Sequence, residues 1–299
     1  MSFYFSLETS APFSPESVLR NLADDQVTYL EHVPDQITFF KPGKSLRGVC
    51  VYQKSGKIDI GLNAFTTRYD ATLMRDIAAA IATALNSKVQ PEDSETPISA
   101  ADVAAYCDTT WQNTRYAEAN SLIHPNAGLD GTELLTVAGY RRAFGFSQDH
   151  VGKLRAQGLS DDAIVANIME DGMDVQEIDQ TEDIFVPKLL ELRPPAPPPV
   201  KPGFFASLFG KTAAAPQVGE PFVAFSLPEN VRTLTPVNAA SGPLFALLQS
   251  ADGGYQRVPA DAVVQAARAI QAREYGVGVF DLTLSGADYV NLAAKGEQM

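Results

Sequence analysis

Leu46–Phe65 reads LRGVCVYQKSGKIDIGLNAF, and this stretch decides the fold class. Two strand-like runs, VCVY (49–52) and KIDIGL (57–62), flank a short turn segment that contains Gly56. Strand-forming runs separated by so few residues, one of them a glycine, are typical of a β-hairpin. Cys50 lies inside the first run, where a free thiol behaves as a small hydrophobic side chain. The stretch therefore predicts two antiparallel strands that bury Cys50.

The segments on either side of this hairpin predict helices that pack on its sheet. In YDATLMRDIAAAIATALN (69–86), large apolar residues recur at every fourth position: Leu73, Ile77, Ile81 and Leu85. This is the spacing of one face of an α-helix, and the intervening alanines favour the helical state. Upstream, SFYFSLE (2–8) alternates as a strand does, and Ser14 followed by Pro15 begins a short helix. Residues 1–95 are thus predicted to form an α+β domain.

The rest of the chain divides at polar and proline-rich stretches. Residues 96–192 are expected to be acidic and mainly helical, with helices over 132–146, 148–157 and 160–171. Six prolines within 193–202 favour polyproline II, so 193–219 is interpreted as a Pro-rich linker. Residues 220–299 are predicted to form a C-terminal α+β domain. The expected fold class is therefore α+β: two small units with mostly antiparallel sheets, separated by the helical region and the linker.

The net charge of −13 is concentrated in the middle of the chain. Residues 96–190 carry 15 acidic and 6 basic side chains, whereas 1–95 carry 12 and 9, and 191–299 carry 9 and 8. Such a field repels nucleic-acid phosphates and anionic lipid, and it attracts basic partners. We therefore expect a basic protein partner and no nucleic acid, and the charge disfavours contact with an anionic membrane.

The acidic residues gather in one run, Ser160–Asp183, which contains no lysine or arginine. Their order does not follow the alternation of a calcium-binding loop, so no metal is expected. One interpretation is a solvated helix face, and the other is a docking surface for a basic protein, since complementary charge accelerates association. The candidate partner-binding residues are Asp161, Asp162, Glu170, Asp171, Asp174, Glu177, Asp179, Glu182 and Asp183.

Catalytic motifs are sparse in this sequence. There is no G-x-S-x-G motif and no Walker loop, and Cys50 and Cys107 give no zinc-type spacing. The one candidate is His124 in the loop SLIHPNAGLDG (121–131), which can act as a general base if Asp108 or Asp130 orients it. The alternative is a polar turn residue bonded to its own loop. No cofactor is expected, and the sparse motifs favour a non-enzymatic protein over an enzyme that uses His124.

An apolar patch follows the prolines in GFFASLFGK (203–211). Its four large side chains have the spacing of one helix face: Phe204, Phe205, Leu208 and Phe209. Burying them yields about 6–10 kcal/mol, and ordering about eight residues costs roughly as much. The patch therefore does not fold alone. Three interpretations remain. The segment is a linker with a weakly interacting apolar patch, a segment that docks on its own chain or on a partner, or a membrane contact.

These observations favour a bacterial, cytoplasmic, non-enzymatic protein-interaction protein. Its concrete form is an immunity-type neutraliser of a basic toxin or nuclease, bound through the acidic middle region. The start MSFYFSLETS has no basic signal region, and no apolar run approaches the roughly 18 residues of a membrane span. The alternatives are an enzyme that uses His124, or an envelope-associated adaptor that uses Phe204–Phe209. The oligomeric state is not predicted.

Overall fold

The structure is a computed structural model of the whole chain, and it describes residues 2–9, 11–33, 35–54, 56–123, 134–178, 184–192, 221–236, 243–250 and 253–298. The chain forms two compact units: Met1–Asp179 with Tyr275–Val279, and Gln180–Glu274 with Phe280–Met299. Helices combine with mainly antiparallel sheets, so the predicted α+β fold class is confirmed. The four-part division at residues 95, 192 and 219 stays a prediction.

The first unit is built on a six-stranded antiparallel sheet in the order β2-β3-β4-β5-β1-β6. Its strands are β1 (Phe3–Glu8), β2 (Thr28–Val33), β3 (Gln36–Phe40), β4 (Val49–Lys54), β5 (Lys57–Leu62) and β6 (Gln90–Pro91). The predicted hairpin is confirmed as β4 and β5, paired from Val49–Leu62 to Lys54–Lys57. Gly56 has a φ of +81°, a conformation that glycine adopts without strain. Cys50 is buried, as expected.

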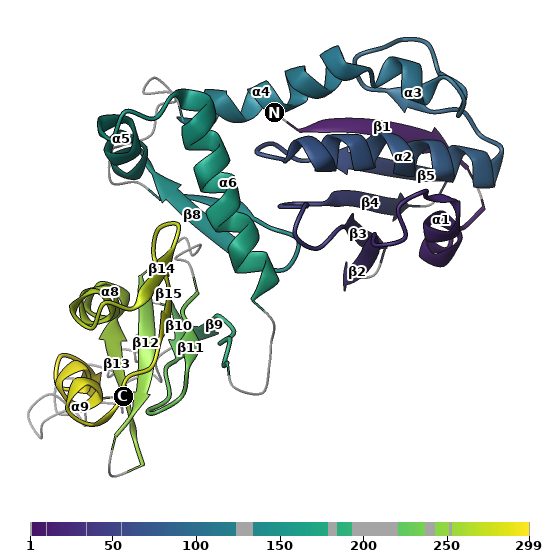
Figure 1. Cartoon of the computed structure of the whole chain (residues 1–299). Coiled ribbons are helices and arrows are strands. Elements are labelled where there is room, and N and C mark those ends of the chain that lie inside the picture. Colours follow the sequence, from purple (N-terminus) through teal and green to yellow (C-terminus); the bar gives the residue numbers. More distant parts are fainter. Residues whose placement is uncertain are drawn as a thin grey trace, which may run out of the picture. The chain divides into compact units, whose positions relative to one another are not determined.

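Helix α2 (Arg68–Leu85) covers one face of this sheet (Figure 1). The predicted stripe is confirmed, because Leu73, Ile77 and Ile81 are buried in the core that the helix shares with the strands. Helix α1 (Pro15–Asn21) begins as predicted, with Ser14 as its N-cap. The alternation of apolar and polar residues thus decides which strand face meets the helices.

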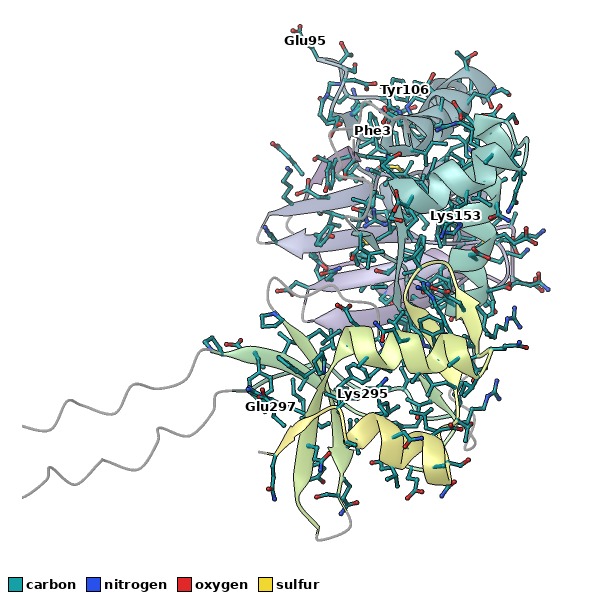
Figure 2. The ribbon with its side chains drawn as sticks, turned by 90° about the vertical axis from the view of Figure 1, so that its left-hand side faces the viewer. Phe3, Glu95, Tyr106, Lys153, Lys295 and Glu297 are labelled. Carbon is teal, nitrogen blue, oxygen red and sulfur yellow. The ribbon has the colours of Figure 1, made fainter. Side chains whose placement is uncertain are left out.

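The middle of the chain adds four helices to the first unit: α3 (Val103–Tyr106), α4 (Thr109–Ile123), α5 (Gln148–Ala156) and α6 (Asp161–Glu177). Trp111 of α4 packs on Phe3, with ring centroids 5.3 Å apart, and Tyr106 of α3 packs on Phe5 at 6.0 Å. Figure 2 shows Phe3 and Tyr106 at the same end of the unit. These aromatic contacts join α3 and α4 to the sheet.

The prediction of a helix over residues 132–146 is wrong. The described part of this segment is an antiparallel hairpin of β7 (Leu134–Ala138) and β8 (Ala143–Ser147). Its strands are rich in valine, threonine, phenylalanine and leucine, which pack well on a pleated surface. The turn between them binds the buried side chain of Gln176, a contact with a residue far along the chain.

The second unit has a five-stranded sheet in the order β16-β13-β12-β10-β9. Its strands are β9 (Leu190–Leu192), β10 (Phe222–Ser226), β12 (Leu244–Gln249), β13 (Tyr255–Pro259) and β16 (Glu297–Gln298). Strands β10 and β12 are parallel, and the other described pairs of this sheet are antiparallel. Helices α8 (Ala260–Ala269) and α9 (Gly286–Ala293) share its core. A further sheet has the order β11-β15-β14, with β11 (Thr233–Leu234), β14 (Arg273–Tyr275) and β15 (Val279–Leu282).

Candidate functional site

Helix α6 has an apolar inner side and an acidic outer side. Its inner side is buried in the core of the first unit and includes Ile164, Val165, Ile168, Met169 and Val175. On the outer side, the exposed Glu170, Asp174 and Glu177 follow one another at i, i+4 and i+7. This spacing places them along one line of the helix surface, which we call the α6 acidic stripe.

The other acids of α6 lie at its start or flank the stripe. Ser160 caps the helix by accepting a hydrogen bond from the Ala163 amide, and Asp161 and Asp162 occupy the first turn. Acids there are favoured by the helix dipole. Asp161 also pairs with Arg155 at 2.7 Å. Asp171 is half-buried beside the stripe. The two first-turn acids therefore help to begin the helix, in addition to any role in binding.

Glu177, the last acid of the stripe, forms hydrogen bonds within the first unit. Glu177 accepts hydrogen bonds from the Gly43 amide at 2.8 Å and from the Tyr140 hydroxyl at 2.5 Å. Burial and this bond to Glu177 raise the pKa of Tyr140, so its phenol stays protonated. The side chain of Arg142 donates to the Val175 carbonyl at 2.9 Å, where a cation suits the helix C-terminus. Glu170 and Asp174 are therefore the central acids of the candidate binding face.

The fully buried Gln176 fixes the β7–β8 hairpin to α6. Its Oε1 accepts hydrogen bonds from the backbone amides of Arg141 and Arg142, both at 2.8 Å. Its Nε2 donates to the carbonyls of Arg142 at 2.9 Å and Gly172 at 3.1 Å. A Cβ at Gly139 would lie 2.3 Å from this nitrogen, so any larger residue there would displace Gln176 from these hydrogen bonds. This contact, together with the apolar core, holds α6 and its acidic stripe against the hairpin.

Asp70 connects α2 to a loop in the same way as Gln176 connects α6 to the hairpin. Its buried Oδ2 accepts from the backbone amides of Leu46 at 3.1 Å and Arg47 at 3.3 Å, and from the Thr66 hydroxyl at 3.2 Å. Its Oδ1 has no hydrogen-bond partner among the described residues. The two buried contacts are linked, because the Tyr140 amide donates to the Leu46 carbonyl at 3.0 Å. Burial lowers the pKa of the Arg47 guanidinium.

The structure does not assemble the predicted catalytic group within its described residues. Asp108 accepts a hydrogen bond from the Trp111 amide at 2.8 Å, so it caps the start of α4. His124 and Asp130 lie outside the described residues. The remaining predicted site residues that lie outside them are Asp179, Glu182, Asp183, Phe204, Phe205, Leu208 and Phe209.

Both cysteines are free and buried. Burial raises the pKa of the Cys107 thiol to about 12, so the reactive thiolate is scarce at neutral pH. Within the described ranges, no group of three or more histidine, cysteine, aspartate or glutamate side chains is placed to hold a metal ion.

A cavity of about 710 Å³ lies in the second unit. It is bounded by the carboxyl ends of β10 and β12, by the start of β13 and by α9, and its lining includes Gln249, Tyr255, Gln256, Tyr289 and Val290. The amino-acid sequence did not predict this site. Its residues come from four separate segments, and no single segment carries a motif that identifies them.

No model of a protein family, no curated protein and no solved structure matches this chain. In the part of the chain that the structure describes, no helix has both the length and the apolar character needed to cross a membrane.

Proposed function

We propose that the chain is a non-enzymatic protein-interaction protein and that the α6 acidic stripe binds a basic protein. The observation that supports this proposal is the arrangement of charge on α6. The helix carries six acids and no lysine or arginine, and its central acids Glu170 and Asp174 lie on the side opposite the core. The partner is expected to present lysine or arginine side chains at matching spacing.

Exposed carboxylates suit such a role because they remain hydrated in the free protein. Their attraction for a basic surface acts over about a Debye length, roughly 8 Å at physiological salt. Complementary charge of this kind mainly raises the association rate and excludes partners of like charge. Binding is therefore expected to weaken as salt concentration rises.

The concrete form of the proposal is an immunity-type neutraliser of a basic toxin or nuclease in the cytoplasm. A nuclease binds phosphates through lysine and arginine. A line of carboxylates on a rigid helix offers those cations the same sign of charge as a phosphate backbone. The stripe would then occupy the substrate surface of the toxin.

A charge-reversal experiment tests the proposal. The double variant Glu170→Lys/Asp174→Lys is compared with Asp25→Lys/Glu95→Lys, which makes the same change of net charge at exposed positions elsewhere in the first unit. The full-length chain is used to capture partners from its source cells at about 150 mM salt, and the affinity for each basic protein captured is then measured.

We expect the stripe variant to bind at least about tenfold more weakly and the control variant to bind within about twofold of the wild type. The proposal is overturned if no basic protein is captured. It is also overturned if both double variants weaken binding equally, because a general effect of net charge would then explain the result.

A further inference from the structure

We infer that the first unit contains a pH-sensitive set of contacts, in which four tyrosine hydroxyls bind carboxylates and hold peripheral segments until acid weakens the bonds. The four tyrosine–carboxylate pairs are Tyr29 with Glu16, Tyr69 with Asp24, Tyr106 with Asp93, and Tyr140 with Glu177. All eight residues belong to the first unit. The inference does not depend on a partner of the α6 acidic stripe, because it concerns the fold alone.

Two of the pairs hold the segment around α1. The Tyr29 hydroxyl, on β2, donates a hydrogen bond to the Glu16 carboxylate of α1 at 2.6 Å. The Tyr69 hydroxyl, at the start of α2, donates to Asp24 at 2.9 Å, and the same carboxylate oxygen accepts from the Lys41 ammonium group at 2.7 Å. Because Asp24 lies between α1 and β2, this segment is held at two points.

The other two pairs hold α3 and the end of α6. The Tyr106 hydroxyl of α3 donates to Asp93, whose carboxylate also lies 3.7 Å from the Arg115 guanidinium. The Tyr140 hydroxyl, in the turn between β7 and β8, donates to Glu177 at 2.5 Å. Each of the four pairs therefore joins two segments of the chain that lie 13 to 45 residues apart.

The four tyrosine rings are fixed by packing. Tyr29, Tyr69 and Tyr106 pack against the core between the first sheet and its helices. Tyr140 is buried and stacks on Phe40. Because ordering a side chain costs conformational entropy, a ring that is already fixed offers its hydroxyl at little further cost. Formation of each bond therefore has to order little more than the carboxylate side chain.

Each bond is strong only while its carboxylate is ionised, since a charged acceptor makes a hydrogen bond roughly twice as strong as a neutral one. The bonds from Ser14 and Tyr29 lower the pKa of Glu16 to about 2. The bond from Lys41 is the main cause that lowers the pKa of Asp24. A carboxylate with a lowered pKa stabilises the fold above its unfolded pKa, and this contribution is lost as the pH falls through the folded pKa. For Glu16 the loss runs from about pH 4.5 to about pH 2.

Other charged groups act on the four pairs from the elements packed around them. These groups are the side chains of Arg20, Glu31, Asp70, Asp76, Arg141 and Arg142. Arginine keeps its charge throughout the acid range, and a tyrosine hydroxyl stays protonated there. The weakening in acid therefore comes from protonation of carboxylates.

Tyr289 of the second unit makes a contact of a different kind. Its hydroxyl accepts from the Gln249 amide at 2.8 Å and donates to the Gln249 carbonyl at 3.4 Å. These backbone groups do not titrate in acid. The Arg257–Glu297 pair of the same unit has an exposed carboxylate, and such surface pairs contribute little to stability. The four tyrosine–carboxylate pairs are thus a property of the first unit.

Two double variants test the inference: Tyr29→Phe/Tyr69→Phe and Tyr106→Phe/Tyr140→Phe. Each removes two donors and keeps the rings. Urea unfolding of the full-length chain is followed at pH 7, 5, 4 and 3 by the fluorescence of Trp111, the one tryptophan of the chain, which lies in α4 of the first unit. We expect each variant to lower the urea midpoint by roughly 0.5–1.5 M at pH 7 and pH 5. The difference from the wild type should shrink below about pH 4.5 and fall to half or less at pH 3.

The control is Tyr4→Phe/Tyr116→Phe, which removes two hydroxyls that bond to no carboxylate within the described part of the first unit. Its midpoint should differ from that of the wild type by the same small amount at every pH. If a double variant does not fold at pH 7, its two single variants are measured in the same way. The inference is overturned if the variants are as stable as the wild type at pH 7, or if their loss of stability is the same at pH 7 and pH 3.

Discussion

The two long helices of the first unit, α2 and α6, are alike on their inner sides and differ on their outer sides. Both begin with a hydroxyl N-cap, and both place one fully buried polar side chain, Asp70 or Gln176, against two consecutive loop amides. Yet α2 carries two basic and two acidic side chains, whereas α6 carries six acidic and none that is basic. The two helices therefore have similar buried sides, and they differ in the charge that their outer sides carry.

The largest loss of stability is expected from substitutions on the buried inner sides of α2 and α6. Ile77→Ala in α2 and Ile168→Ala in α6 each remove a side chain that is no more than 1% exposed. Each should lower the free energy of unfolding by about 2–5 kcal/mol, measured by urea denaturation. Thr83→Ala, at an exposed position of α2, is the control. A loss below about 1 kcal/mol in only one helix would show that the inner sides are not equivalent.

Substitutions at the two buried polar side chains, Gln176 and Asp70, should cause the second largest loss of stability. Gln176→Leu leaves the amides of Arg141 and Arg142 without their acceptor and should cost about 1–3 kcal/mol in urea denaturation. Asp70→Leu should cost at least as much, because that carboxylate also accepts from the Thr66 hydroxyl. If Gln176→Leu is as stable as the wild type, the hairpin is held by its apolar contacts alone.

These contacts also explain how far the sequence predicts the fold. The β4–β5 hairpin and helix α2 depend on short-range patterns, so both were predicted correctly. The β7–β8 hairpin was missed because Gln176, which binds its turn, lies 34 residues beyond Arg142. The acidic run predicted the candidate binding face, but the sequence did not show that Glu177 bonds to Tyr140, because the two residues lie 37 positions apart.

The N-caps should give a smaller effect. Thr67→Ala in α2 and Ser160→Ala in α6 each remove a hydroxyl that accepts a backbone hydrogen bond at the helix start. Each should cost about 1 kcal/mol. The loss should be greater for Thr67, whose hydroxyl also donates to the Lys44 carbonyl at 3.1 Å. Thr67→Ser should retain most of the stability, and urea denaturation of the three variants tests this order.

The smallest effect on stability is expected on the outer side of α6. Glu170→Gln/Asp174→Asn should change the free energy of unfolding by no more than about 0.5 kcal/mol, since exposed charges contribute little. Glu177→Gln should cost more, because Glu177 bonds to the Gly43 amide and the Tyr140 hydroxyl. Thermal and urea unfolding provide the measurement. A loss above about 1 kcal/mol in the double variant would assign the central acids to the fold instead of to a partner.

The packing of the β7–β8 segment on Phe40 and Phe65 has a consequence for the synthesis of the chain. Tyr140 stacks on Phe40 with ring centroids 3.9 Å apart, and Phe146 stacks on Phe65 at 5.0 Å. The ribosome makes Phe40 and Phe65 some 80 to 100 residues before these partners. At about 5–20 residues per second, several seconds pass before they are covered. Until residue 146 has emerged, Phe40 of β3 and Phe65, which follows β5, therefore lack these stacking partners.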